Sequence, residues 1–150
     1  MQGKPKVLFF STGTAVRSQM AEGFLRTMSG GALEGRCTGV RPESSPLAAE
    51  VMREVGIDVS SDKPAEIQEL FKEHFACVIT LSDPAKERDP VWPFTRNLYH
   101  WRLPDPLEGK SSPDEQRRAL RQVRDEIADN VRDFASRVAP QLKARAAGKG

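Results

Sequence analysis

A serine, an arginine and a second serine lie close together after a short apolar run near the start of the chain. The run Val7–Phe10 is typical of a strand buried on both faces, and residues 18–28 have the spacing of an amphipathic helix. A strand, a tight loop and a helix bring backbone N–H groups and the positive end of a helix dipole together. Gly13 lets the backbone approach a ligand closely, and the guanidinium of Arg17 is a bidentate fork for a tetrahedral oxyanion. The pattern fits a site for phosphate, arsenate or sulfate, and by spacing alone it fits an ordinary strand-to-helix turn with a surface arginine equally well. The residues expected around the anion are Ser11, Thr12, Gly13, Thr14, Ala15, Val16, Arg17 and Ser18.

An aspartate between two prolines is a second candidate for chemistry. Pro104 and Pro106 restrict the backbone on either side of Asp105, so its carboxyl group is positioned as an acid for a leaving group must be. The alternative is a Pro-Asp-Pro turn with no chemical role. The segment 82–93 is interpreted as a plain surface loop in preference to a lid.

The rest of the chain alternates between strand and helix patterns. Strands are predicted over 35–40, 77–81 and 97–101. One helix should begin at Ser45-Pro46 and end before Gly56, with Ala48, Val51, Met52 and Val55 facing inward. Pro64 should open another, which carries Ile67, Leu70 and Phe71. The last should start at a capping box of Ser112, Pro113 and Glu115 and stop at Pro140, with apolar residues at Leu120, Val123, Ile127, Val131, Phe134 and Val138.

This alternation predicts an α/β fold with a four-stranded parallel sheet, right-handed crossovers and helices on both faces. Ligands bind such sheets beyond the carboxyl ends of the strands. Ser11, Ser82 and Asp105 each follow a predicted strand, so the topology should bring these three segments to one site.

Length and composition limit the remaining possibilities. The 150 residues suit a single domain over 1–150, with 139–150 expected as a flexible tail. The formal net charge is +2, so no basic field predicts binding to nucleic acid or to a membrane surface, and the Val7–Phe10 run is too short to span a bilayer. Only Cys37 and Cys77 are present, which predicts a reducing, cytoplasmic location. The residues imply no metal site and no cofactor.

The order of these motifs resembles a known family over roughly residues 5 to 138. The stretch 11–26, STGTAVRSQMAEGFLR, is similar to the active-site loop and first helix of the low-molecular-weight protein tyrosine phosphatase and thioredoxin-coupled arsenate reductase superfamily. Further matches are Gly39, Ala49–Ser60, Val78–Ser82, His100-Trp101, Pro104-Asp105-Pro106 and Arg124–Ile127. His100-Trp101, together with Leu107 in place of an aromatic residue, favours the arsenate reductase branch.

The resemblance implies roles for individual positions. It places the family's nucleophilic thiolate at position 11, the arginine that holds the oxyanion at Arg17, a hydroxyl that assists the nucleophile at Ser18 and the general acid at Asp105. In the reductase branch, two further cysteines that relay oxidising equivalents to thioredoxin fall at positions 82 and 89. This chain carries Ser11, Ser82 and Asp89 there, so all three positions lack sulfur.

The missing sulfur predicts a loss of catalysis. A cysteine pKa near ~8.5 can fall by several units at a helix N-terminus, whereas a serine hydroxyl needs a strong neighbouring base. The two histidines, His74 and His100, are not neighbours of Ser11 in sequence. Arsenate reduction also requires a thiol as the electron donor. We therefore expect oxyanion binding with no reductase activity by the family route and with very weak or absent phosphatase activity.

Several alternatives remain open. The serine at position 11 is either an engineered replacement in an active parent or a natural loss. Thr14, where the reductase branch usually has asparagine, argues partly against engineering, so the two explanations have similar weight. An active parent would act on a phosphorylated substrate or, as a reductase, depend on an external thiol or thioredoxin system. A second hypothesis is a non-enzymatic sensor of phosphate, arsenate or a phosphorylated protein. A third hypothesis is that the protein hydrolyses its substrate with Ser11 as the nucleophile. Cys37 is interpreted as a buried structural thiol in preference to a reactive one.

Overall fold

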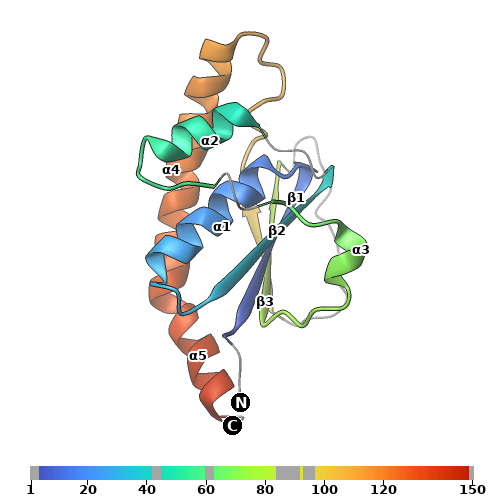
Figure 1. The fold of residues 1–150 in the computed structure, drawn as a ribbon, viewed down its shortest axis with the longest axis vertical. Helices are drawn as coiled ribbons and strands as arrows, with labels where there is room; N and C mark the ends of the chain where they lie inside the picture. The colour runs from blue at the N-terminus through green and yellow to red at the C-terminus, as the bar shows by residue number, and fades with distance from the viewer. Residues whose placement is uncertain (1–3, 42–44, 60–62, 84–91, 93–96, 149–150) are drawn as a thin grey trace.

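A computed structural model describes residues 4–148 of the chain, except 42–44, 60–62, 84–91 and 93–96. Figure 1 shows strands and helices in alternation along the first half of the chain and a long helix near its end. The elements are β1 (Lys6–Thr14), α1 (Val16–Met28), β2 (Glu34–Arg41), α2 (Pro46–Arg53), α3 (Ile67–Leu70), β3 (Cys77–Ser82), β4 (Leu98–Arg102), α4 (Pro113–Arg137) and α5 (Ala139–Gly148).

The four strands form one parallel sheet in the order β2-β1-β3-β4. In the register, Ser11 lies opposite Gly39 on β2 and Leu81 on β3, and Ser82 lies opposite Arg102 on β4. The carboxyl ends of the strands therefore share one edge, as the predicted topology requires. The predicted α/β class and parallel sheet are confirmed.

Helices cover both faces of the sheet (Figure 1). On β1, Val7 and Phe9 join the core under α1 and α4, while Leu8 and Phe10 join a smaller cluster that includes Leu70 of α3. This division explains why Val7–Phe10 are all apolar, although successive residues of a strand face opposite sides of the sheet.

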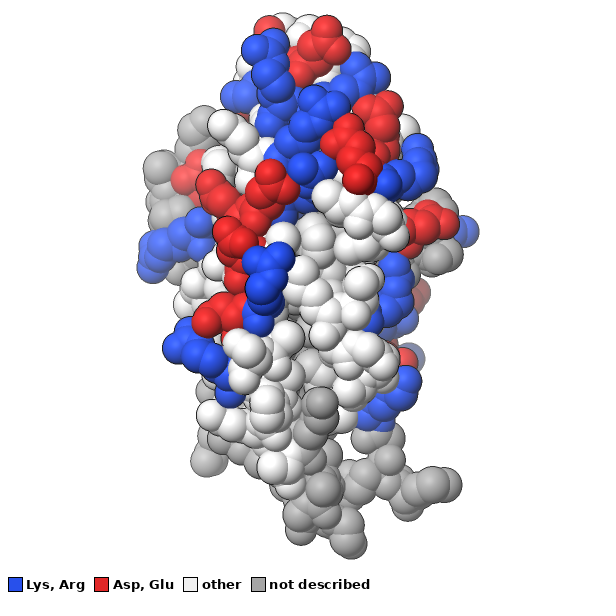
Figure 2. All heavy atoms as spheres, turned by 90° about the vertical axis from the view of Figure 1, so that its left-hand side faces the viewer, with Lys and Arg blue, Asp and Glu red and all other residues white. Residues whose placement is uncertain are grey.

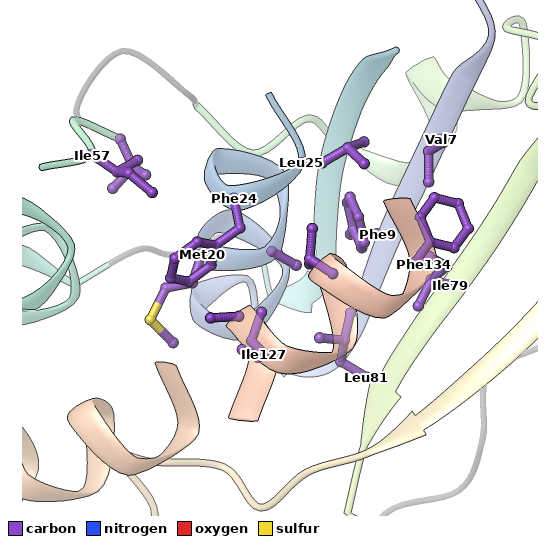
Figure 3. Packing of buried hydrophobic residues seen from close by; sticks show 14 of the residues in the cluster. Val7, Phe9, Met20, Phe24, Leu25, Ile57, Ile79, Leu81, Ile127 and Phe134 are labelled. Carbon is purple, nitrogen blue, oxygen red and sulfur yellow. The ribbon is translucent and has the colours of Figure 1, made fainter. Parts of the chain in front are cut away.

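The larger core lies between the sheet and the pair α1 and α4. Figure 3 shows Met20, Phe24 and Leu25 of α1 beside Ile127 of α4 and Phe9 of β1. All five side chains are buried. Burying a side chain of this size stabilises a fold by about 1.5–3 kcal/mol, so this layer fixes the position of α1 and of the loop that precedes it.

The long helix begins where the sequence predicts. The side chain of Ser112 accepts a hydrogen bond from the backbone N–H of Glu115 at 3.1 Å, and Pro113 occupies the first turn. Ser45 caps α2 in a similar way, through the backbone N–H of Leu47 at 3.2 Å. None of the helices in the described ranges is both long and apolar enough to cross a membrane.

Three predicted helix boundaries were wrong. The second helix ends at Arg53, and Gly56 (φ +80°) reverses the chain, so Val55 lies in the turn and is 44% exposed instead of facing inward. The helix expected from Pro64 is a single turn over Ile67–Leu70. Phe71 follows this turn, is exposed and stacks on Trp92 with ring centroids 5.0 Å apart.

The chain after Pro140 also differs from the expectation. A flexible tail was predicted for 139–150, but α5 extends over Ala139–Gly148 and buries Ala139 and Leu142 against the core. Val138 ends α4, and Pro140 is tolerated because it lies in the first turn of the next helix.

An ion-pair cluster joins α2 to α4. Arg121 and Arg124 both contact Glu54, each at 2.8 Å, and Arg117 pairs with Glu50. Arg124 also donates to the carbonyl oxygen of Val51 at 2.9 Å. Figure 2 shows the face that α4 presents, where basic and acidic side chains are intermixed over the upper part of the view. These ion pairs therefore hold α2 against α4.

This cluster predicts an acid-sensitive contribution to stability. The hydrogen bond from Arg121, with a further one from Arg124, lowers the pKa of Glu54 from 4.5 to about 2. Because the folded-state pKa lies below the unfolded value, the contribution is complete above pH 4.5 and is lost as the pH falls towards 2. We expect Glu54→Gln to lower the urea midpoint at neutral pH and the difference from the parent protein to shrink below pH 4.5. A difference that stays constant down to the lowest pH would contradict this assignment.

Candidate functional site

The loop between the first strand and the first helix is shorter than predicted. β1 continues to Thr14 and α1 begins at Val16, so Ala15 alone separates them. The register between β1 and β2 shifts between Ser11 and Thr14, which places one extra residue on β1. The expected eight-residue loop is therefore an irregular strand end followed directly by the first turn of α1.

The side chain of Ser11 is completely buried against the start of α1. Its Oγ accepts a hydrogen bond from the backbone N–H of Ser18 at 2.9 Å. Ala15 precedes the helix and has no side-chain oxygen that could serve as a cap. Ser11 therefore supplies, from the strand, the oxygen that satisfies a free N–H in the first turn of α1.

The hydroxyl of Ser18 is engaged elsewhere. It contacts the carbonyl oxygens of Ala15 at 3.0 Å and of Thr38 at 2.8 Å, and it donates to them. The family resemblance implied that this hydroxyl assists the nucleophile at position 11. Here the backbone of Ser18 contacts Ser11, while its hydroxyl ties the helix to β2.

Arg17 is the largest of the completely buried side chains, at 1% exposure. One guanidinium nitrogen, Nη1, donates to the carbonyl oxygen of Leu103 at 2.9 Å. The backbone N–H of Leu103 in turn donates to the carbonyl oxygen of Ser82 at 2.9 Å. Leu103 thus joins the segments that carry Arg17, Ser82 and Asp105.

Asp105 is half-buried and its carboxylate is held locally. Its Oδ1 accepts the backbone N–H of Leu107 at 3.0 Å, which closes a turn over Pro106. The side chain is therefore fixed in the way expected for a residue between prolines. The segment is joined to the start of α1 through the contact between Leu103 and Arg17.

Gly39 lies against the irregular end of β1. A Cβ atom at this position would be 2.9 Å from the backbone nitrogen of Ala15, from the carbonyl oxygen of Arg41 and from that of Gly13. All three neighbours are backbone atoms, so none can move aside without shifting a strand or the loop.

We therefore expect Gly39→Ala to destabilise the protein by about 1–3 kcal/mol, as overpacking of a tight contact does. Equilibrium denaturation in urea measures this change. Gly35 provides the matched control, because its added Cβ would meet the flexible side chain of Glu22 instead of backbone. An equal effect of the two substitutions would contradict the close-approach explanation.

Thr12 carries a polar atom that the fold leaves without a partner. Its Oγ1 is buried and forms no hydrogen bond with any residue that the structure describes. A buried hydroxyl without a partner destabilises a fold unless a ligand or a water molecule satisfies it.

Among the residues that the structure describes, no base is hydrogen-bonded to the hydroxyl of Ser11. Within the described parts of the chain, the Ser18 N–H is the hydrogen-bond partner of the Ser11 hydroxyl. His100 Nδ1 contacts the hydroxyl of Thr80 instead. Groups of three or more histidine, cysteine, aspartate or glutamate side chains able to hold a metal ion are absent from these same residues.

Neither cysteine replaces the missing thiol. Both are buried and free of disulfide bonds, and burial raises the pKa of Cys77 to about 12. The burial predicted for Cys37 is confirmed. Ser82 is buried at the end of β3, and Asp89 lies outside the described residues.

The sequence contained no signal for two of the groups that organise the site. These are the carbonyl oxygens of Leu103 and Thr38, which receive Arg17 and Ser18. Every residue has such a carbonyl, so only the register of the strands identifies which ones are used.

Comparison with known proteins places this geometry in context. The model of the family "Low molecular weight phosphotyrosine protein phosphatase" matches residues 6–144. An arsenate reductase of Bacillus subtilis strain 168 is 31% identical over 130 residues, which cover 86% of this chain and 94% of the relative. An arsenate reductase 2 of Staphylococcus saprophyticus is 36% identical over 132 residues, covering 87% and 96%. The solved structure of an arsenate reductase in the phosphate binding state superposes with a TM-score of 0.72 at 28% identity, covering 89% of this chain and 98% of the other.

Proposed function

Because this chain belongs to the low molecular weight phosphotyrosine protein phosphatase family, we propose that its Ser11–Ser18 segment binds phosphate, arsenate or sulfate without the family's thiol chemistry. The arsenate reductases among its relatives suggest tetrahedral oxyanions as the ligands. The solved structure of an arsenate reductase in the phosphate binding state, which superposes on this chain, supports the same choice.

The buried guanidinium of Arg17 carries this proposal. This charged group has almost no solvent contact, and its Nη1 donates to the carbonyl oxygen of Leu103, so the guanidinium is held in place at the start of α1. Arg17 lies in the first turn of α1, where the helix dipole and the free N–H groups also favour an anion. The buried hydroxyl of Thr12 offers a further donor for an oxyanion.

The hydrogen bonding of Ser11 argues against turnover. Its Oγ accepts the Ser18 N–H, and no base among the described residues contacts its hydroxyl. An alcohol in this position has a pKa far above neutrality, so the attacking alkoxide is not formed to a useful extent. Reduction of arsenate also needs two electrons from thiols, and positions 11, 82 and 89 carry serine, serine and aspartate.

The structural role of Ser11 favours a second candidate function. Because its hydroxyl caps α1, the serine fits a protein whose task is to bind an oxyanion or a phosphorylated protein and report it. Such a sensor needs the residues that bind the anion but does not need a nucleophile. The two functions share the same ligand and differ in whether a thiol at position 11 restores turnover.

Calorimetric titration of the protein with inorganic phosphate, arsenate and sulfate tests the shared part of the proposal. We expect saturable binding and, at a phosphate concentration of about 100 times Kd, an increase in stability of about 2.7 kcal/mol. Sodium chloride at equal ionic strength is the control for general screening. Absence of both heat and thermal stabilisation with all three anions would refute anion binding.

A further inference from the structure

Two exposed arginines end the outer strands on either side of the anion loop. Arg41 is the last residue of β2 and Arg102 the last residue of β4, and both are exposed. Arg41 lies opposite Thr14 of the loop, and Arg102 lies opposite Ser82. Because parallel strands share one carboxyl edge, the two arginines end strands on either side of β1, at the edge of the sheet where Ser11 lies.

Neither of these arginines forms an ion pair or a hydrogen bond with any residue in the described ranges. This distinguishes them from most other arginines of the chain. Among the described residues, those that pair with a carboxylate are Arg26, Arg36, Arg117, Arg121, Arg124, Arg132 and Arg137. Arg53 and Arg118, which also lack a partner among the described residues, lie on α2 and α4, away from the strand ends.

Two carboxylates among the described residues follow the strand ends at this edge of the sheet. Asp105 uses its carboxylate to hold the N–H of Leu107 in its own loop, and Asp83 follows the end of β3. Neither of them pairs with Arg41 or Arg102. The two guanidinium groups therefore remain available to a ligand.

We propose that the ligand of this site is a phosphorylated segment of another protein with acidic side chains next to the phosphorylated residue. The proposal rests on the oxyanion site argued above, in which Arg17 receives the phosphate. Arg41 and Arg102 then contact carboxylates on either side of it. A lone phosphate or arsenate ion fills the loop but leaves both outer arginines without a partner.

The spacing of the strands fits an extended peptide. Neighbouring strands lie about 4.8 Å apart, so Arg41 is about 5 Å and Arg102 about 10 Å from the line of β1. Successive residues of an extended chain advance by about 3.3 Å. Acidic residues two or three positions from the phosphorylated residue are therefore displaced by about 7–10 Å, within reach of two long arginine side chains.

The size of the expected effect follows from the exposure of both arginines. An exposed ion pair changes affinity by a factor of about 1.5–5, so two such pairs raise it by about 3–20-fold at low salt. The gain should fall as the ionic strength rises, because exposed pairs are screened.

The test compares two fluorescent phosphotyrosine peptides in polarisation assays on the full chain. One peptide has glutamates at the second and third positions on each side of the phosphotyrosine, and the other has glutamines there. The measured quantity is the ratio of their affinities, which cancels the contribution of the phosphate itself. The variants are Arg41→Gln, Arg102→Gln and the double variant. Arg132→Gln is the matched control, because Arg132 is equally a surface arginine but lies far along α4 and pairs with Asp129.

We expect the glutamate peptide to bind about 3–20-fold more tightly to the parent protein and to Arg132→Gln, and the ratio to approach 1 in the double variant. Equal affinities for the two peptides, with inorganic phosphate still bound, would overturn this inference and leave the anion site intact. A ratio that survives in the double variant would overturn the assignment to these arginines. If neither peptide nor phosphate binds, the proposed function itself fails.

Discussion

Replacing Ser11 by cysteine should raise the hydrolysis of p-nitrophenyl phosphate by about 10³-fold or more if the chain is a disabled enzyme. The reason is acidity. A thiol at position 11 would receive the N–H of Ser18 and lie at the positive end of α1, and both favour the thiolate. Arsenate reduction by the same variant should require an added thiol, because positions 82 and 89 carry no sulfur. Initial rates at neutral pH, with and without dithiothreitol, measure both activities.

Ser11→Ala is the control for this experiment. It removes the oxygen that caps α1, so we expect a loss of stability of about 1 kcal/mol and no hydrolysis. If Ser11→Cys binds phosphate as the parent protein does but gains no activity, the sensor function is favoured over the disabled enzyme. If Ser11→Ala lowers an activity that the parent protein already has, the serine is a nucleophile and the proposal is wrong.

Replacing Arg17 by lysine should weaken phosphate binding by about 10–100-fold, although the formal charge is unchanged. A lysine ammonium is a point charge that cannot present two parallel N–H groups to an oxyanion while it also satisfies the Leu103 carbonyl. Calorimetric titration of the parent protein and the variant gives the ratio of the two dissociation constants.

Arg26→Lys is the matched control because Arg26 lies on the same helix and donates to the carbonyl oxygen of Asp58 at 2.9 Å. It should leave phosphate affinity unchanged. Thermal unfolding of both variants without ligand separates a loss of binding from a loss of folding. Equal phosphate affinity in the parent protein and in Arg17→Lys would show that the guanidinium does not hold the anion.

Together the contacts of Ser11 and Arg17 suggest how the site can persist without its nucleophile. The serine caps the helix, and the arginine joins the loop to the segment of Asp105 through Leu103. Both residues therefore contribute to the fold as well as to the proposed ligand site. Retention of the loop does not by itself require that the protein turn over a substrate.

The sequence alone was sufficient for the architecture and for the candidate site residues. The apolar run Val7–Phe10, the strand at Cys77 and the long helix after Ser112 are local patterns, and each lies where it was predicted. Periodicity and capping depend on neighbours within a few residues, so they can be read without knowledge of the fold. The family resemblance then identified Ser11, Arg17 and Asp105 by their order along the chain.

The tertiary structure decided how these residues are held. It showed that Ser11 caps α1, that the Ser18 hydroxyl bonds to β2, and that Arg17 reaches the carbonyl oxygen of Leu103. It also showed that Gly39 must lack a side chain. The partners in each case are backbone atoms, which are present at every position and carry no sequence signal. Their selection depends on strand register and close approach between distant segments, and only the folded chain defines these.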